Sequence, residues 1–276
     1  MYEIALESFS ASDIAESGQC FRMSPLKEEG AYKLVAFGKY LKIVQKEDGK
    51  IQFHCSENEF NEIWKEYFDL NRNYSDFQKV ALEDDIYLKQ AIAFGKGIRI
   101  LNQEPWEMLI SFIISQRKSV PAIRTSVERL SERLGKPIYS DNGSGDILEY
   151  SFPSPEKLAE ADIDILSECG LGYRTEYVAN AARSVLRGDI DFEFLKSLET
   201  DHLIEELMKQ KGVGIKVASC VALFGFHRLD VVPVDVWMKR VIDTVYNGEL
   251  PKEYKPYAGV IQQYLFNYAR LNGVEF

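Results

Sequence analysis

The sequence predicts an α+β protein in which an antiparallel β-sheet domain, residues 1–100, precedes a mainly α-helical body, residues 101–276. Between Ala31 and Cys55, short runs rich in Val, Ile, Phe and Tyr pass through Asp48-Gly49, a pair typical of hairpin turns, so we expect two antiparallel strands there. From residue 57 onward the apolar residues recur mostly at helical spacing, first at Phe60, Ile63, Trp64 and Tyr67.

Composition places the chain among folded globular proteins. Its 276 residues are 46% hydrophobic, enough to bury a core without disulfides, and the net charge is −10. No run approaches the roughly 18 apolar residues of a membrane-spanning helix, and the first residues lack the basic start and apolar core of a signal peptide. The four cysteines form no CxxC pair. We therefore expect an intracellular protein with no membrane segment and no bound metal.

Several segments of the body have recognisable boundaries. Trp106–Ser115 is almost wholly apolar and is typical of a buried central helix, whereas residues 119–134 alternate apolar and charged positions like a helix at the surface. Asn142–Gly145 is predicted to be a flexible connection. Ser154 then precedes a proline and a glutamate, which predicts a helix start capped by the serine.

Two predicted helices separated by a glycine-rich turn form the most informative stretch. Asp201–Gln210 and Ile215–Phe226 are joined by a hairpin, residues 211–215, whose centre is Gly212, Val213 and Gly214. The glycines allow positive φ angles, and the valine fills the gap between the helices. The backbone N–H groups at the start of the second helix suit a phosphate. An ordinary helix–helix turn is the alternative.

Lys216 lies in the first turn of the second predicted helix, where the positive helix end disfavours an ammonium ion. A cation is misplaced there if stability is its only purpose. The apolar residues that follow, VASCVALF, favour the neutral amine instead. A neutral amine can attack an electrophilic sugar carbon and form a Schiff base, so Lys216 is the candidate nucleophile.

Asp235 follows Lys216 after 19 residues, just beyond Pro233 and at the start of another predicted helix. The position suits an N-cap, and that structural role alone would explain an aspartate. Helix-start N–H groups also keep a carboxylate ionised, so it could stabilise positive charge on a sugar or assist proton transfer. The two roles are compatible.

The segments GVGIKVASC and VPVDVWM resemble the helix-hairpin-helix (HhH-GPD) DNA glycosylase superfamily, and more closely the 8-oxoguanine DNA glycosylase/AP lyase family in its clostridial-like bacterial form. Three further segments, SGQCFR at Ser17–Arg22, CGLGYRTEYV at Cys169–Val178 and AGVIQQYLF at Ala258–Phe266, are similar to the family motifs SGQxFRW, LGLGYRxxYV and AGxxQxxLF. The resemblance implies a TBP-like antiparallel sheet domain followed by an HhH glycosylase body.

The resemblance also implies a role for each matching residue. Lys216 would be the Schiff-base nucleophile and Asp235 the catalytic carboxylate. Gly18 would offer its carbonyl to the N7–H that 8-oxoguanine has and guanine lacks, with a simple turn glycine as the alternative. The extruded base would be bound by Cys220, Phe266 and Gln262. By composition alone, the cysteine and the phenylalanine are core residues.

On the DNA side, the resemblance assigns Tyr173 and Arg174 to the space that the extruded base leaves, with a solvated surface pair as the alternative. Arg117 and Ala122 stand where eukaryotic members have the asparagine and arginine that read the opposite cytosine, so we do not expect a strict preference for cytosine. Trp237 replaces a phosphate-binding histidine; its indole N–H could donate to a phosphate, or the ring could simply pack.

The net negative charge argues at first against a nucleic-acid partner, but the charge is unevenly spread. Residues 105–136 carry six basic and three acidic side chains, a local charge of +3, and residues 209–240 carry six and two, a local charge of +4. These stretches include the hairpin and the candidate nucleophile. Double-stranded DNA containing oxidised guanine therefore stays the expected partner.

The predicted function is that of a bifunctional DNA glycosylase/AP lyase of base excision repair, which flips out 8-oxoguanine and removes it through a lysine Schiff base and β-elimination. One alternative is an HhH glycosylase for another damaged base, and the other is a non-catalytic HhH DNA-binding module. We expect no cofactor, although the hairpin carbonyls leave room for a structural cation. We expect a monomer in the bacterial cytoplasm that acts at the nucleoid.

Overall fold

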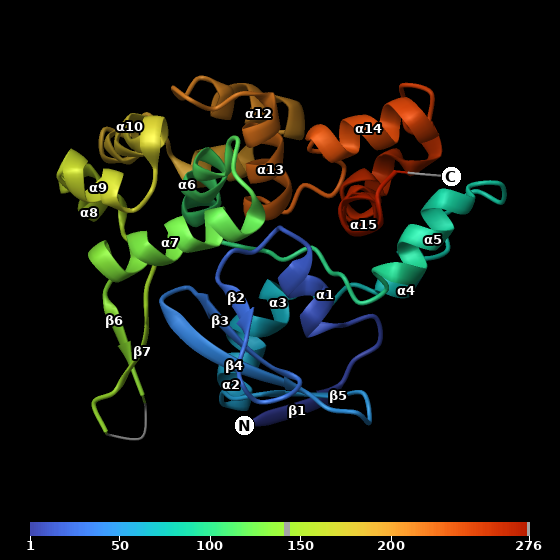
Figure 1. The fold of residues 1–276 in the computed structure, drawn as a ribbon, viewed down its shortest axis with the longest axis horizontal. Helices are drawn as coiled ribbons and strands as arrows, with labels where there is room; N and C mark the ends of the chain where they lie inside the picture. Colours follow the sequence, from blue (N-terminus) through green and yellow to red (C-terminus); the bar gives the residue numbers. More distant parts are fainter. Residues whose placement is uncertain (141–143, 275–276) are drawn as a thin grey trace.

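A computed structural model describes residues 1–140 and 144–274 of the chain. They form an antiparallel sheet, short helices on one of its faces, and a larger helical body beyond these helices (Figure 1). The predicted α+β class and the order of its parts are confirmed. The predicted connection Asn142–Gly145 falls partly outside the described residues. Within those residues, no helix combines the length and the apolar character needed to cross a lipid bilayer.

The sheet has five antiparallel strands within residues 1–53, in the order β1-β5-β4-β3-β2. They are β1 (Tyr2–Ala5), β2 (Met23–Pro25), β3 (Ala31–Ala36), β4 (Lys39–Gln45) and β5 (Lys50–Phe53). The segment from residue 31 to 55 thus holds three strands, and the prediction of two was wrong. An additional turn at Phe37 and Gly38, with φ of 53° and 69°, separates β3 from β4. The sequence hides this turn because a bulky residue rarely adopts positive φ.

One face of the sheet packs against short helical segments, α1 (Ala11–Glu16), the π-helical turn η1 (Phe60–Trp64) and α3 (Lys65–Tyr67). The short helix α2 (Glu57–Glu59) directly precedes η1 and buries no residue. Phe60 and Trp64, predicted to share a helix face, are both buried in this core. Cys20 and Met23 belong to the same core. The loop that carries Gly18 is therefore anchored to the sheet domain on its C-terminal side.

The helical body is built around α6 (Pro105–Ser115), in which every residue from Glu107 to Ser115 is buried, as its apolar sequence predicts. Helix α7 (Val120–Leu134) is amphipathic, and α8 (Pro155–Glu160) begins at the predicted Ser154 cap. The other helical segments are α4 (Tyr74–Phe77), α5 (Ile86–Phe94), α9 (Ile163–Glu168), η2 (Gly172–Arg174), α10 (Thr175–Leu186), α11 (Phe192–Ser197), α12 (Thr200–Met208), α13 (Ile215–Gly225), α14 (Val236–Val245), η3 (Lys252–Tyr257) and α15 (Ala258–Asn272).

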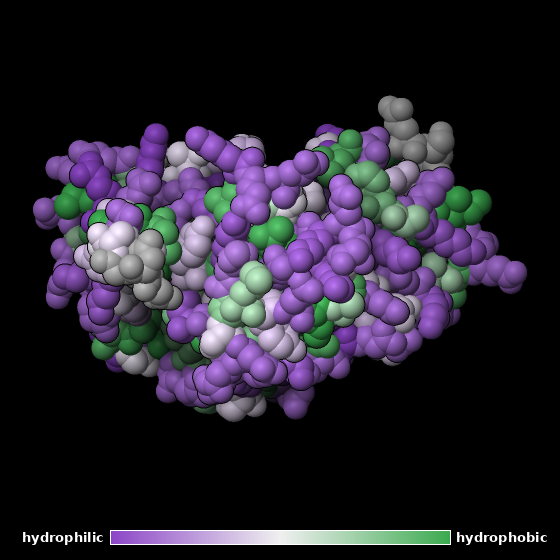
Figure 2. Space-filling model, turned by 90° about the horizontal axis from the view of Figure 1, so that it is seen from below, coloured by the Kyte–Doolittle hydropathy of each residue, from purple (hydrophilic) through white to green (hydrophobic). Residues whose placement is uncertain are grey.

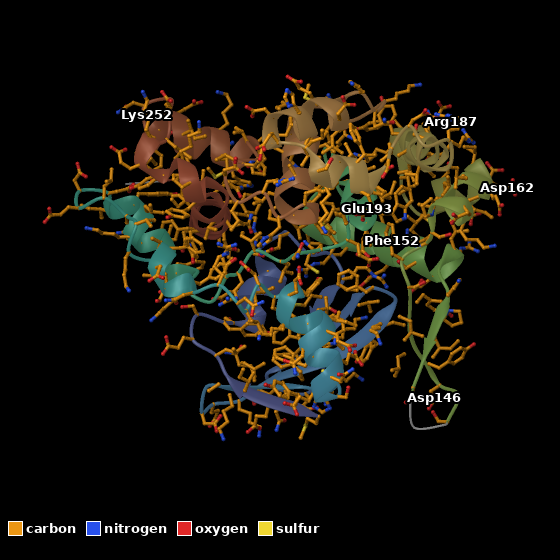
Figure 3. All side chains as sticks on the ribbon, turned by 180° about the vertical axis from the view of Figure 1, so that it is seen from behind. Asp146, Phe152, Asp162, Arg187, Glu193 and Lys252 are labelled. Atoms are coloured by element: carbon orange, nitrogen blue, oxygen red, sulfur yellow. The ribbon has the colours of Figure 1, made fainter. Side chains whose placement is uncertain are left out.

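A second, two-stranded sheet interrupts the helical body, where the sequence predicts none. Strands β6 (Pro137–Tyr139) and β7 (Ile147–Tyr150) extend away from the helices and alongside the main sheet (Figure 1). Figure 3 shows Asp146 near the far end of this hairpin and Phe152 back beside the helical body. The strands are too short to give a readable alternation. Arg22 and Lys33 of the sheet domain bind Tyr150 and Glu149 of β7.

Helices α4 and α5 belong to the first hundred residues, yet Tyr74, Phe77 and Leu88 are buried in the core of the helical body. Figure 1 shows α5 beside α15, at the opposite end of the molecule from the β6–β7 hairpin. The domain boundary at residue 100 stays a prediction. On the face seen in Figure 2, hydrophilic residues predominate and apolar residues form separate patches.

Glu107 of α6 is a buried carboxyl group between the two parts of the chain. Burial raises its pKa to about 7, opposed by Arg22 of the sheet domain, whose Nη1 lies 4.0 Å from Glu107 Oε2. The folded state thus holds this proton more tightly than the unfolded state does, so stability is highest below the unfolded pKa and falls as pH rises from about 4.5 to about 7.

We predict that Glu107→Gln flattens this pH dependence. The neutral amide resembles the protonated carboxyl, so the two proteins should be similarly stable at low pH, and the variant should gain up to about 3 kcal/mol relative to wild type above the folded pKa. Urea unfolding midpoints of both proteins, measured at low and high pH, check the prediction. Parallel changes of the two midpoints with pH would contradict it.

Candidate active site

The predicted hairpin joins α12 to α13. Val213 is buried between the helices as predicted, and Gly212 has φ of +88°. A Cβ at Gly212 would lie 2.4 Å from Tyr177 Cγ, so this position requires glycine for space as well as for conformation. The prediction of positive φ at Gly214 was wrong: its φ is −95° because, as the N-cap of α13, it takes the extended backbone of that position.

Lys216 lies in the first turn of α13, half-buried against α6. Its Nζ donates to Ser115 Oγ at 3.4 Å and lies 5.4 Å from the centre of the Phe112 ring. Both contacts come from the buried central helix. They hold the amine at the edge of the apolar core, beside the N-terminal end of α13.

Asp235 is the N-cap of α14, as predicted. Its Oδ1 accepts hydrogen bonds from the backbone N–H groups of Trp237 (3.0 Å) and Met238 (2.9 Å). These bonds fix the carboxylate through one oxygen and leave Oδ2 outside the cap. In the part of the chain that the structure describes, no ion pair joins Asp235 to Lys216, although both side chains line the same cavity.

That cavity brings together all the residues that the resemblance assigns to catalysis and to base binding. Its volume is about 50 Å³, room for a few water molecules, so a purine can be inserted only when the lining side chains move apart. The lining residues are Gly18, Phe112, Lys216, Cys220, Phe224, Pro233, Asp235, Gln262, Gln263 and Phe266. Sequence reasoning missed Gln263, because only its neighbour is part of a motif.

Cys220 lies one helical turn beyond Lys216 and is buried. Burial raises the pKa of its thiol; the charge of Lys216 opposes this effect and that of Asp235 adds to it. The thiol is therefore neutral at physiological pH and gives the cavity a polarisable apolar wall. Phe266 lies on α15, so its ring reaches the cavity from a different helix.

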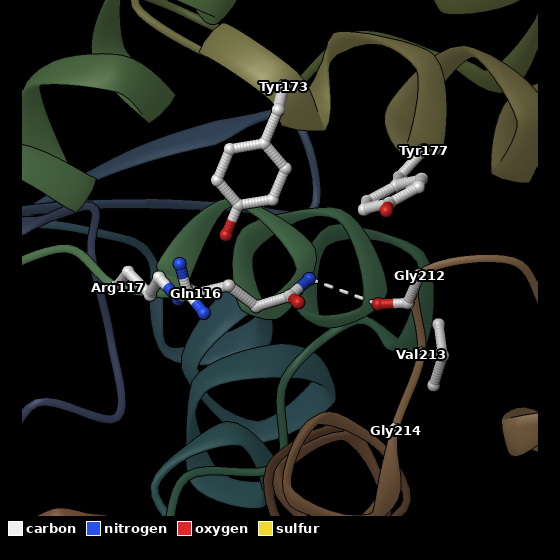
Figure 4. A pocket seen from close by; sticks show the side chains of 7 residues that line it. All are labelled: Gln116, Arg117, Tyr173, Tyr177, Gly212, Val213 and Gly214. Carbon is white, nitrogen blue, oxygen red and sulfur yellow. Dashed lines mark hydrogen bonds between the residues drawn. The ribbon is translucent and has the colours of Figure 1, made fainter.

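Two hollows lie close to the hairpin, and the second of them shares lining residues with the cavity. Figure 4 shows the first, of about 500 Å³, between the rings of Tyr173 and Tyr177 and the hairpin glycines. In it, Gln116 Nε2 donates to the Gly212 carbonyl at 3.0 Å and ties the end of α6 to the hairpin. The second, of about 550 Å³, is lined by Lys216 and Asp235 and by the cations Arg117, Lys118 and Lys239. The two hollows share Gln116 and Arg117 as lining residues; we call them together the basic groove, whose cations suit a phosphate backbone.

Arg174 is not a solvated residue, so the surface-pair alternative was wrong for it. It is 6% exposed, and its Nε donates to the Gln116 carbonyl at 2.8 Å while Nη1 donates to the Leu171 carbonyl at 3.1 Å. Tyr173 is 53% exposed, and its ring lies 4.3 Å from the guanidinium carbon. In this structure the arginine braces the loop after α6 and the tyrosine faces the solvent.

Two of the three positions that depart from the family motifs, Arg117 and Trp237, differ in their setting. Arg117 is exposed and has φ of +53°, so its cation projects from a strained turn at the groove. Trp237 is half-buried and packs against the helical core, with the guanidinium of Arg240 5.4 Å from its ring. The packing role of Trp237 is thus observed, and its contact with a phosphate stays a prediction.

Gly18 has φ of +77°, and a Cβ there would lie 3.2 Å from Phe266 Cε1. Gly18→Ala is therefore expected to strain the loop and displace the aromatic wall of the cavity. A misplacement of this kind costs about 10²-fold in base excision. Cleavage at a preformed abasic site should be retained, because no base then has to enter the cavity.

Gly49→Ala is a matched control, since Gly49 has φ of +80° but a Cβ there would meet nothing within 4 Å. Both variants should lose similar stability, about 1 kcal/mol, and only Gly18→Ala should lose excision. Excision and abasic-site cleavage are measured on the same duplex sequence. Equal excision by the two variants would remove Gly18 from the base site.

The fold, and the lysine and the aspartate that line one cavity, indicate the class of protein. The family described as "HhH-GPD superfamily base excision DNA repair protein" matches residues 110–257, and "8-oxoguanine DNA glycosylase, N-terminal domain" matches residues 1–109. The chain belongs to the 8-oxoguanine DNA glycosylase family within the HhH-GPD superfamily. The resemblance inferred from the sequence is confirmed.

Individual relatives agree with this assignment. The 8-oxoguanine glycosylase/lyase of Clostridium acetobutylicum, solved with double-stranded DNA containing cytosine opposite 8-oxoguanine, shares 36% identity and superimposes with a TM-score of 0.89, covering 98% of this chain and 94% of that one. A probable N-glycosylase/DNA lyase of Methanothermobacter thermautotrophicus is 30% identical over 75% of this chain and 74% of its own length. The N-glycosylase/DNA lyase of Saccharomyces cerevisiae is 35% identical over 63% of this chain and 49% of its own length.

Proposed function

We propose that the protein is a bifunctional DNA glycosylase/AP lyase that excises 8-oxoguanine from duplex DNA in base excision repair. The observation that carries this proposal is the single cavity lined by Lys216, Asp235 and Gly18, next to a basic groove. The same cavity contains Cys220, Gln262 and Phe266, the residues expected to bind the extruded base. The similarity to glycosylase/lyases over nearly the whole chain supports it.

In the proposed mechanism, the ammonium group of Lys216 first loses a proton, and the lone pair of its nitrogen then attacks C1′ of the flipped nucleotide. The bond from C1′ to the base breaks, and its electron pair leaves with the base. The carboxylate of Asp235, held by the start of α14, stabilises the positive charge that develops on the sugar. The C1′–O4′ bond then breaks, O4′ takes up the proton that the nitrogen loses, and an open-chain imine between C1′ and Lys216 results. This imine makes the C2′ proton acidic, so β-elimination expels the 3′ phosphate and cleaves the strand. Side chains alone carry this chemistry, and it uses no redox cofactor.

Recognition of the duplex is assigned to the hairpin and to the basic groove. The N–H groups at the start of α13 bind phosphate, and Arg117 and Tyr173 face the gap left by the base. Arg174 reaches that gap only after it leaves the carbonyls of Gln116 and Leu171. Ala122 stands where eukaryotic members have the arginine that reads the opposite cytosine. We therefore expect the protein to excise 8-oxoguanine also when the opposite base is not cytosine. We further propose that the protein acts as a monomer on DNA of the bacterial nucleoid.

The test uses duplexes that differ only at one position, which holds 8-oxoguanine, guanine or an alkylated purine. We expect base release and a borohydride-trapped adduct with the 8-oxoguanine duplex alone. Release of the alkylated purine alone would indicate a glycosylase for another lesion. Binding of the duplexes without release of any base would indicate a non-catalytic DNA-binding module, and either outcome would overturn the proposal.

A further inference from the structure

Two neighbouring glutamines on α15 reach the base cavity, although the family motif specifies only one. Gln262 matches the motif AGxxQxxLF, whereas Gln263 stands at a position that the motif leaves open. Their side chains are 3% and 2% exposed, and both line the cavity that also contains Lys216 and Asp235. The cavity therefore has a second amide that the roles assigned above do not use.

The hydrogen bonds of this second amide are incomplete. Gln263 Nε2 donates to Gln262 Oε1 at 3.2 Å. The Oε1 of Gln263 is buried and has no hydrogen-bond partner within the part of the chain that the structure describes. A buried acceptor without a partner destabilises the folded state, and such groups are few in native proteins. Gln263 therefore has an acceptor available for a ligand of the cavity.

Around the two amides the cavity wall is largely apolar. Phe112, Phe224 and Phe266 supply aromatic rings, and Pro233 has no backbone N–H to donate. Lys216, Cys220 and Gln262 also line the cavity, but none of them donates to Gln263 Oε1, so a ligand that enters the cavity can supply the donor. The hydrogen bond from Gln263 to Gln262 also orients the amide of Gln262, so the two side chains present one hydrogen-bonding edge to the cavity.

The pairing edge of a guanine-type base carries three polar groups in a row, a carbonyl oxygen, N1–H and the 2-amino group. A single glutamine amide offers one donor group and one acceptor in its plane, so it can satisfy only two neighbouring groups of this edge. The third group, the 2-amino donor, requires another acceptor. The amide pair of Gln262 and Gln263 supplies this complement of one donor group and two acceptors.

We propose that Gln263 is a specificity-determining residue whose Oε1 accepts a hydrogen bond from the 2-amino group of the extruded base. This inference rests on the proposed function and deepens it, because it extends recognition from the oxidised side of the purine to its pairing edge. Gln262 pairs with the carbonyl oxygen and N1–H of the same edge. A hypoxanthine-type base, which differs by lacking the 2-amino group, leaves Gln263 without a partner.

The test compares single-turnover excision of 8-oxoguanine and 8-oxohypoxanthine from the same duplex. We expect wild type to remove 8-oxoguanine about tenfold faster, the effect of about one hydrogen bond. Gln263→Met should lower only the 8-oxoguanine rate and so abolish the preference. Tyr264→Phe is the matched control, since Tyr264 is buried on the same helix but is not a lining residue, and it should keep the preference.

Borohydride trapping on a preformed abasic site, which places no base in the cavity, verifies that each variant is folded. An equal loss of both rates in Gln263→Met would mean that Gln263 only positions Gln262, and unchanged rates would mean that it contacts nothing; either result overturns the inference. Equal wild-type rates on the two bases would overturn it without any variant. Failure of the proposed function looks different, because wild type would then release no 8-oxoguanine.

Discussion

Lys216→Gln is expected to abolish borohydride trapping and to lower excision of 8-oxoguanine by about 10³-fold or more, the scale on which removal of a covalent nucleophile acts. Lys216 is the amine that the structure places in the cavity together with Asp235. Glutamine keeps most of the side-chain volume against Phe112 and can still hydrogen-bond Ser115. The loss would therefore report on the amine and not on the packing of α13.

The unfolding midpoint of Lys216→Gln shows whether the loss of activity comes from the missing amine or from misfolding. Because Lys216 is a cation at the positive end of α13, its replacement should leave the unfolding midpoint unchanged or slightly raised. Lys239→Gln removes the same charge from the same groove and serves as the control. It should weaken DNA binding but retain trapping at saturating protein. Trapping by Lys216→Gln at the wild-type level would contradict the assignment.

Asp235→Asn is expected to lower excision by about 10² to 10³-fold without changing stability. The loss corresponds to one preorganised charge removed from the developing sugar cation. Asparagine is as good an N-cap as aspartate, so its amide oxygen can still accept from Trp237 and Met238. The variant therefore separates the two roles of Asp235, since it keeps the N-cap and removes the catalytic charge.

Asp191 provides the matched control for Asp235. It caps α11 in the same way, with Oδ1 accepting from Glu193 (2.9 Å) and Phe194 (3.1 Å), and it is not a lining residue of the cavity. Asp191→Asn should change neither excision nor the unfolding midpoint. If both asparagine variants excise like wild type, Asp235 is a cap and no more.

Local patterns predicted the parts of the fold that local interactions determine. The apolar run in α6, the Ser154 cap and the hairpin at Gly212 all lie where the sequence indicates. The additional turn at Phe37 and the β6–β7 hairpin do not, because one uses an unusual residue for its conformation and the other has very short strands. Contacts with distant parts of the chain stabilise the latter, among them that of Arg22 with Tyr150.

In the candidate site, too, the sequence predicted the residues that belong to local motifs and missed those whose role depends on distant contacts. Motifs predicted Lys216, Asp235 and Gly18, since each stands at a helix start or turn with a recognisable sequence. They did not predict the burial of Arg174, whose carbonyl partner on Gln116 lies 58 residues away. Gln263 was missed because its significance depends on one unpaired oxygen, and a sequence carries no record of pairing.

The most direct test of the account is the position of the covalent bond to DNA. The complex trapped by borohydride on an 8-oxoguanine duplex is digested with protease and nuclease, and the modified peptide is sequenced by mass spectrometry. We predict a single deoxyribose remnant on the side chain of Lys216. A remnant on Lys118, Lys239 or the N-terminal amine, with Lys216 unmodified, would contradict the account.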